Sequence, residues 1–163
     1  SSPVDFLGIN YYTRVTMEAG ARGDGGIPAG GSGELTDMGW EVWPEGLFEL
    51  LSRVNSEYYG GDIYITENGA AYPDGPDPSG RIRDARRTDY IRRHLLQAAR
   101  ALGEGIPLRG YFAWSLLDNF EWSHGYTKRF GLCWVDFDTL ERLPKDSAYY
   151  YRKVIEANDL CHA

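Results

Sequence analysis

The sequence has few cysteines and no long apolar run. Among its 163 residues there are only two cysteines, Cys133 and Cys161, and they lack the spacing of metal ligands. Two such thiols indicate a reducing compartment rather than a disulfide framework, so we expect a cytoplasmic protein without a metal site. No apolar run approaches the length of a transmembrane helix and there is no signal-peptide core, so we expect no membrane association.

Positive charge is also scarce, because the formal net charge is −7. Binding to phosphate backbones needs a basic surface, so nucleic acid is excluded as the expected partner. The one basic run, Arg81–Arg93, opens a helical pattern and is interpreted as a solvated helix face. The glycine-rich stretch Gly20–Gly33 has neither a lysine nor the spacing of a phosphate cradle, so the sequence predicts no cofactor.

The chain does contain a repeated pattern of strand, long loop and helix. It occurs at Val4–Asn55, Ile63–Leu102 and Leu108–Asn158. This alternation is typical of an α/β fold with parallel strands and crossover helices. With 42% hydrophobic residues, a chain of this length has enough apolar material for one domain.

The local patterns also place individual elements. β-Branched and aromatic residues favour strands, whereas apolar residues three and four apart favour helices. The predicted strands are Val4–Thr13, Ile63–Thr66, Gly110–Leu117 and a shorter one in Leu132–Phe137. The predicted helices begin near Pro44, Arg86 and Pro144.

Polar and aromatic side chains follow each main strand at its carboxyl end. Parallel strands bring these ends together, and catalytic groups lie there in barrels of alternating strands and helices. Glu67 sits between a strand and the turn signal Asn68-Gly69, so it is either a catalytic carboxylate or a cap of that turn. Indole rings beside carboxylates and amides indicate sugar recognition. The grouped residues are Asn10, Tyr12, Glu67, Asn68, Trp114, Asp118, Asn119, Glu121 and Trp122.

Several longer motifs resemble the carboxyl-terminal part of family 1 glycoside hydrolases, the β-glucosidase family. The resemblance covers nearly all of residues 1–163, except two loops near 20–33 and 71–81. The matching stretches are Asp5–Tyr12, Gly39-Trp40-Glu41, Pro44–Leu47, Ile65–Gly69, Trp114–Trp122, Gly125-Tyr126, Lys128–Gly131 and Lys145-Asp146-Ser147.

This resemblance implies an enzyme that hydrolyses terminal β-linked glucosyl residues with retention, in pathways such as cellulose degradation. It implies a partial (β/α)8 TIM barrel, with residues 1–163 supplying βα units six to eight of one domain. Glu67 matches the nucleophile, and Tyr12 matches the tyrosine that donates a hydrogen bond to it. The matched substrate-binding residues are Asn10, Trp40, Trp114, Glu121, Trp122 and Phe130.

One motif of the family is absent. The acid/base glutamate lies in an Asn-Glu-Pro motif that does not occur here, and Glu41, Glu45 and Glu49 are interpreted as capping or solvated charges near a helix start. We therefore expect the isolated chain to be inactive and its partner to be the amino-terminal part of the same enzyme. The substrate would be a β-glucoside or a short β-linked oligosaccharide.

Two other interpretations stay open. The chain is alternatively a non-catalytic barrel fragment that at most binds sugar, or it belongs to a different retaining barrel hydrolase. The motifs Asn10-Tyr11-Tyr12 and Phe120-Glu121-Trp122 argue against the second of these. Glu121 would accept hydrogen bonds from hydroxyl groups but repel phosphate, so phosphorylated sugars are disfavoured as substrates.

Overall fold

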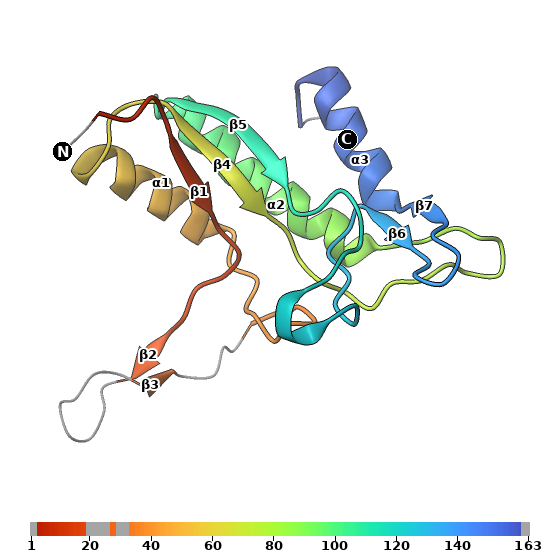
Figure 1. The fold of residues 1–163 in the computed structure, drawn as a ribbon. Helices are drawn as coiled ribbons and strands as arrows, with labels where there is room; N and C mark the ends of the chain where they lie inside the picture. Colours follow the sequence, from red (N-terminus) through yellow and green to blue (C-terminus); the bar gives the residue numbers. More distant parts are fainter. Residues whose placement is uncertain (1–2, 19–26, 29–32, 161–163) are drawn as a thin grey trace.

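Three parallel strands form the sheet around which the chain folds. The structure is a computed structural model that describes residues 3–18, 27–28 and 33–160. The strands are β1 (Leu7–Asn10), β4 (Ile63–Asn68) and β5 (Leu108–Ala113), in the order β1-β4-β5 (Figure 1). Both strand pairs are parallel, which confirms the α/β pattern of strands joined by crossover helices.

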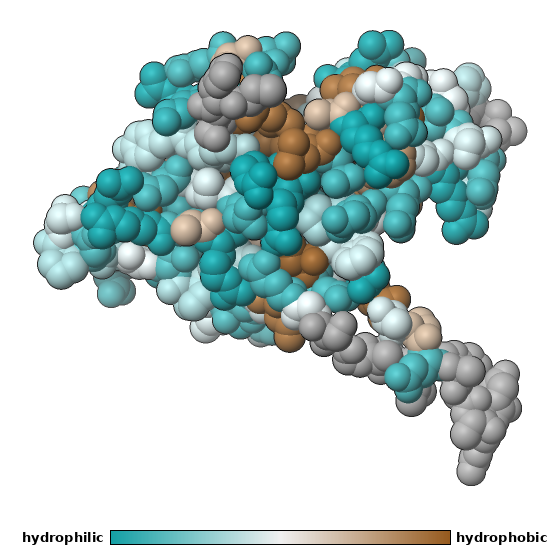
Figure 2. All heavy atoms as spheres, turned by 180° about the vertical axis from the view of Figure 1, so that it is seen from behind, coloured by the Kyte–Doolittle hydropathy of each residue, from teal (hydrophilic) through white to brown (hydrophobic). Residues whose placement is uncertain are grey.

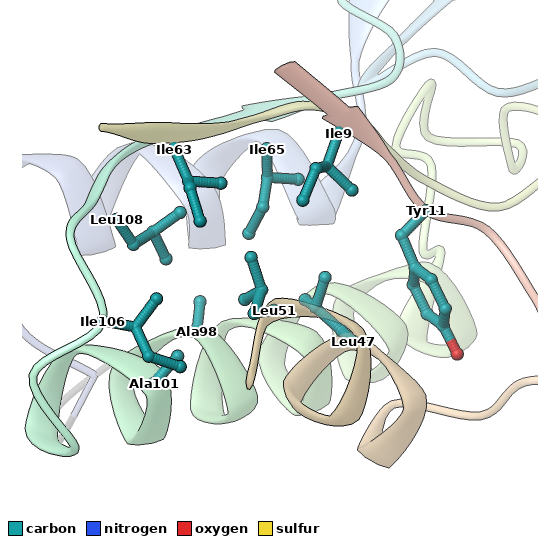
Figure 3. Packing of buried hydrophobic residues seen from close by; sticks show 10 residues of the cluster. All are labelled: Ile9, Tyr11, Leu47, Leu51, Ile63, Ile65, Ala98, Ala101, Ile106 and Leu108. Atoms are coloured by element: carbon teal, nitrogen blue, oxygen red, sulfur yellow. The ribbon is translucent and has the colours of Figure 1, made fainter. Parts of the chain in front are cut away.

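Two of the helices cover one face of this sheet. They are α1 (Glu45–Glu57), which begins directly after Pro44, and α2 (Ala85–Gly103). Proline is suited to a helix start because the first backbone N–H groups have no partner within the helix. Ile63 and Ile65 of β4 point at Leu47 and Leu51 of α1, and all four are fully buried (Figure 3).

The last helix, α3 (Asp146–Ala157), packs on α2, and its Tyr151 hydroxyl donates to the Tyr111 carbonyl of β5 at 2.9 Å. Its buried Tyr150 joins a second apolar cluster that includes Tyr90 and Ile91 of α2. The predicted helix from Pro144 to Asn158 is therefore confirmed, apart from its first two residues and its last.

The remaining elements are short. Strand β2 (Met17–Glu18) pairs with β3 (Ile27–Pro28), and β6 (Cys133–Val135) pairs with β7 (Arg142–Pro144). A 3-10 helix, η1, spans Trp122–His124. Most of the glycine-rich stretch at 20–33 and Cys161 lie outside the described residues. None of the helices in the described ranges is long and apolar enough to cross a membrane.

The other face of the sheet carries exposed apolar side chains. Phe6 is 55% exposed and Phe112 is 57% exposed. In Figure 1 the helices α1 and α2 lie behind the sheet. Figure 2 shows the molecule from that helical side, which is largely hydrophilic with scattered apolar patches. Within the described ranges, β1 and β5 each pair with β4 alone, so both outer edges of the sheet lack a further strand.

The residues Asn68 and Gly69, which were predicted to form a turn, do not do so in the structure. Asn68 is the last residue of the strand, and neither Asn68 nor Gly69 adopts a positive φ. Glycine is needed at position 69 for another reason. A Cβ atom there would lie 1.8 Å from the backbone oxygen of Trp114, which is closer than any two such atoms can approach. Gly69 thus lets the carboxyl ends of β4 and β5 come together.

Candidate active site

Glu67 and Tyr12 meet at the carboxyl ends of two neighbouring strands. Glu67 lies near the end of β4, and Tyr12 follows β1 by two residues. The Tyr12 hydroxyl donates a hydrogen bond of 2.6 Å to Oε2 of Glu67. Both side chains are partly buried, so this contact between a phenol and a carboxylate is only partly screened by water.

The surroundings keep Tyr12 protonated. Burial raises the pKa of Tyr12 far above its usual value of 10.0, and the hydrogen bond to Glu67 raises it further. The negative charges of Glu67 and Glu121 contribute in the same direction. Tyr12 is therefore a permanent hydrogen-bond donor to Glu67 at physiological pH.

Three aromatic rings gather beside this carboxylate. Tyr12 makes edge contacts with Trp40 at 5.5 Å and with Phe130 at 6.1 Å between ring centroids, and Trp40 lies 6.1 Å from Phe130. Trp40 is partly exposed and also lines a cleft of about 230 Å³. Phe130 is only 2% exposed, so it packs against the other two rings as a buried neighbour.

The segment after β5 brings the other matched residues near the site. Trp114 is partly buried, and its backbone N–H donates to the Asn68 carbonyl at 2.8 Å. Glu121 directly precedes η1 and is partly buried. Trp122 is 82% exposed and has a positive φ, so its indole ring projects into solvent. Of these three residues, Trp114 is held at the carboxyl end of β4 by its backbone hydrogen bond to Asn68, whereas the Trp122 ring makes little contact with the rest of the described chain.

Asn10 ends β1 next to the strand that carries Glu67. It is exposed, and its Oδ1 accepts a hydrogen bond of 2.7 Å from the Thr66 hydroxyl. It is the register partner of Glu67 across β1 and β4, although its side chain contacts Thr66 and not Glu67. Its role in substrate binding stays a prediction.

Two ion pairs fix the loop that carries Trp40. Glu41 is buried and pairs with Arg14 at 2.8 Å, so it is not the solvated charge expected from the sequence. On the other side of Trp40, the Lys128 ammonium donates to the Asp37 carbonyl at 2.6 Å and to its carboxylate at 3.0 Å. Lys128 belongs to the segment after β5, so this contact joins the two loops around the site.

A buried network of charges lies behind the segment after β5. Asp118 accepts from Lys145 at 3.1 Å, from Arg129 at 2.6 Å, and from two backbone N–H groups. Lys145 is fully buried, and this burial lowers its pKa to about 8. The members of this ionic network are Asp74, Asp84, Asp118, Arg87, Arg129 and Lys145.

Arg87 shows what the sequence pattern missed. It belongs to the basic run that was interpreted as a solvated helix face, yet it is 1% exposed and pairs with Asp74 and Asp84. The only available signal was the three-residue spacing of Asp84 and Arg87, which suits an ion pair on one helix face. Such spacing is too common to indicate burial by itself.

Glu67 and the phenol that donates to it thus lie at the carboxyl ends of parallel strands, with the Trp40 ring against Tyr12, which is the end of the sheet where α/β barrels carry their active sites. The sequence profile described as glycosyl hydrolase family 1 matches residues 1–160. The chain therefore belongs to glycosyl hydrolase family 1.

Individual relatives agree with this assignment. The chain is 46% identical to β-glucosidase A of Thermotoga maritima, over 96% of the chain and 35% of the relative. It is 40% identical to a 6-phospho-β-galactosidase of Staphylococcus epidermidis, over 96% of the chain and 38% of the relative. A solved structure of the Thermotoga maritima β-glucosidase in complex with glucoimidazole superposes with a TM-score of 0.93 at 45% identity, covering 96% of the chain and 35% of that structure. The chain thus spans about a third of the length of these relatives.

Proposed function

We propose that this chain carries the nucleophile of a retaining β-glucosidase and that the proton donor belongs to a separate part of the enzyme. The hydrogen bond from Tyr12 to Glu67 is the observation that carries this proposal. It holds the carboxylate oxygen Oε2, and in this proposal the other oxygen attacks the sugar. In this assignment residues 1–163 supply βα units six to eight of the barrel.

The proposed reaction has two displacements. The Glu67 carboxylate attacks the anomeric carbon, the glycosidic C–O bond breaks, and the departing oxygen takes a proton from a carboxylic acid outside this chain. That group, now a carboxylate, removes a proton from water, which displaces Glu67 from the sugar. Retention requires the two carboxyl groups to lie about 5–5.5 Å apart.

The other matched residues would hold the sugar. Trp114 would lie under the apolar face of the ring, and Glu121 and Trp122 would hydrogen-bond its more distant hydroxyl groups. Trp40, above Phe130, would form a wall for the leaving group. The partly buried position of Glu121 supports this arrangement.

The need for a second part is supported by the sheet. Both of its outer edges lack a further strand among the described residues, and Phe6 and Phe112 are exposed on its uncovered face. An apolar parallel sheet is normally covered on both faces. We therefore propose that the amino-terminal part of the same enzyme covers this face and supplies the acid/base group.

Fragment complementation tests this proposal. The purified chain, the first two thirds of the Thermotoga maritima β-glucosidase A, and their mixture are assayed with an aryl β-glucoside. We expect hydrolysis by the mixture only. Turnover by the chain alone would contradict a missing proton donor, and a monomeric chain with a cooperative thermal transition would contradict the need for a second part. If the mixture assembles and binds glucoimidazole without turnover, the non-catalytic alternative is correct.

Replacing Glu121 with Ser tests the substrate class. A carboxylate repels the phosphate of a 6-phosphoglucoside, whereas a hydroxyl group does not. In the complemented enzyme we expect E121S to shift the ratio of kcat/KM values at least about tenfold towards the phosphorylated substrate, corresponding to about 1.4 kcal/mol. The ratio should stay unchanged in E141S, which alters an exposed glutamate. An unchanged ratio in E121S would count against the role of Glu121.

A further inference from the structure

The regular ladder of the sheet is interrupted on both sides of Glu67. The register between β1 and β4 shifts between Ile9 and Asn10, and the register between β4 and β5 shifts between Ile65 and Asn68. Backbone hydrogen bonds from the Tyr11 N–H to the Glu67 carbonyl at 2.9 Å and from the Trp114 N–H to the Asn68 carbonyl at 2.8 Å cross this region. The position of Glu67 is therefore not fixed by ladder hydrogen bonds alone.

The Asn68 side chain also helps to fix the backbone beside Glu67. It is fully buried, and its Nδ2 donates to the Tyr11 carbonyl at 2.7 Å and to the Tyr90 hydroxyl at 3.1 Å. Its Oδ1 accepts from the Tyr111 hydroxyl at 2.5 Å. These three hydrogen bonds tie the residue after Glu67 to the exit of β1, to α2 and to β5.

Tyr90 completes the link to Tyr12. Its hydroxyl donates to the Tyr12 carbonyl at 3.0 Å while it accepts from Asn68. The Tyr90 ring is fully buried and stacks on His94 at 3.9 Å between centroids, so its position is set by the packing of α2. Burial raises the pKa of Tyr90 well above its usual value, which keeps the hydroxyl available as a donor.

We propose that Tyr90 and Asn68 are positioning residues that hold Tyr12 in register with Glu67. Tyr90 fixes the backbone of Tyr12, and Asn68 fixes the backbone next to Glu67. The 2.6 Å contact between the Tyr12 hydroxyl and the Glu67 carboxylate depends on both backbones. This inference rests on the proposed role of Glu67 as the nucleophile.

The substitution Tyr90→Phe tests it, because phenylalanine keeps the ring and loses only the hydroxyl. In the complemented enzyme, a 2-deoxy-2-fluoro glucoside would trap Glu67, and mass spectrometry of the peptide containing it gives the rate. We expect Y90F to form this ester about tenfold more slowly, with the binding constant of the reagent changed less than about twofold. Y72F is the matched control, because Tyr72 is also buried but its hydroxyl donates, within the described ranges, to Glu34 alone, at 3.4 Å.

A second measurement does not depend on catalysis. Hydrogen exchange of the Tyr11 amide, in this chain and in the complemented enzyme, reports the backbone bond to Glu67. We expect this amide to exchange about tenfold faster in Y90F and at the wild-type rate in Y72F, since the loss of one buried hydrogen bond changes a local equilibrium by about this factor.

The outcomes separate the two proposals. If Y90F forms the ester on Glu67 at the wild-type rate and its Tyr11 amide also exchanges at the wild-type rate, the positioning role is overturned. Failure of the wild-type enzyme to form the ester on Glu67 would overturn the proposed nucleophile, while the Tyr11 exchange would still decide the positioning role. If Y90F does not assemble, Y111F removes a different hydrogen bond of Asn68. Wild-type values of both rates in Y111F would then overturn the proposal.

Discussion

Replacing Glu67 with Gln is expected to lower kcat/KM of the complemented enzyme for an aryl β-glucoside by at least about a thousandfold. Glutamine has nearly the same shape and can still accept a hydrogen bond from Tyr12, but its amide does not form an ester with the anomeric carbon. A thousandfold loss corresponds to about 4 kcal/mol of transition-state stabilisation. Steady-state rates measured with equal amounts of assembled enzyme would give the ratio.

The matched control is E49Q, which alters an exposed glutamate of α1 and should retain the wild-type rate. A second variant, E67G, distinguishes a nucleophile from a residue that only orients the substrate. With azide present, E67G should form the α-glucosyl azide, because azide would enter from the face that Glu67 leaves empty. Formation of the β-azide, or a rate in E67Q within tenfold of wild type, would contradict the assignment.

Acidification is expected to destabilise the folded enzyme through His94. His94 is fully buried, and this burial lowers its pKa from 6.5 to about 4. Its Nδ1 lies 2.8 Å from the Tyr90 carbonyl, and its Nε2 has no hydrogen-bond partner among the described residues. The unfolded chain therefore binds a proton at this residue between pH 6.5 and 4, whereas the folded chain does not.

This difference in proton binding sets the direction of the pH dependence of the free energy of unfolding. The stabilising contribution of neutral His94 is present above pH 6.5 and is lost as the pH falls to about 4, which amounts to about 3 kcal/mol. Urea unfolding of the complemented enzyme between pH 4 and 7 would measure it. H94F keeps a ring against Tyr90 and should show a shallower loss, while H124F, at an exposed site, should follow the wild type. Equal slopes for wild type and H94F would contradict the prediction.

Much of the fold could be predicted because its cause is local. The β-branched residues at Ile63 and Ile65 predict a buried strand, and the spacing of Leu47, Leu51 and Val54 predicts a helix that follows Pro44. The structure places these elements as expected and packs their apolar faces together. The parallel arrangement also followed from the order of elements, since parallel strands need long crossovers.

The site could be predicted only in part. Sequence placed Glu67 and Tyr12 at strand ends, but their contact joins residues 55 positions apart and came from the family resemblance, not from any local pattern. Asn68 was interpreted as a turn residue, because an asparagine before glycine indicates a turn. The sequence holds no sign that the Asn68 side chain instead forms hydrogen bonds to three other elements. Strand β7 was missed because Arg142–Pro144 is short and contains proline.

The ionic network behind the segment after β5 also limits which substitutions the chain can accept. It contains three carboxylates and three cations, so its formal charge is zero while all six groups are ionised. Loss of one partner leaves an uncompensated buried charge, whereas the loss of an acid and a base together restores the balance. Accepted replacements at Asp118 and Lys145 should therefore occur in pairs, and a library that varies one position at a time would classify both as immutable. We therefore expect Asp118 and Lys145 to change together, although they lie 27 positions apart in the sequence.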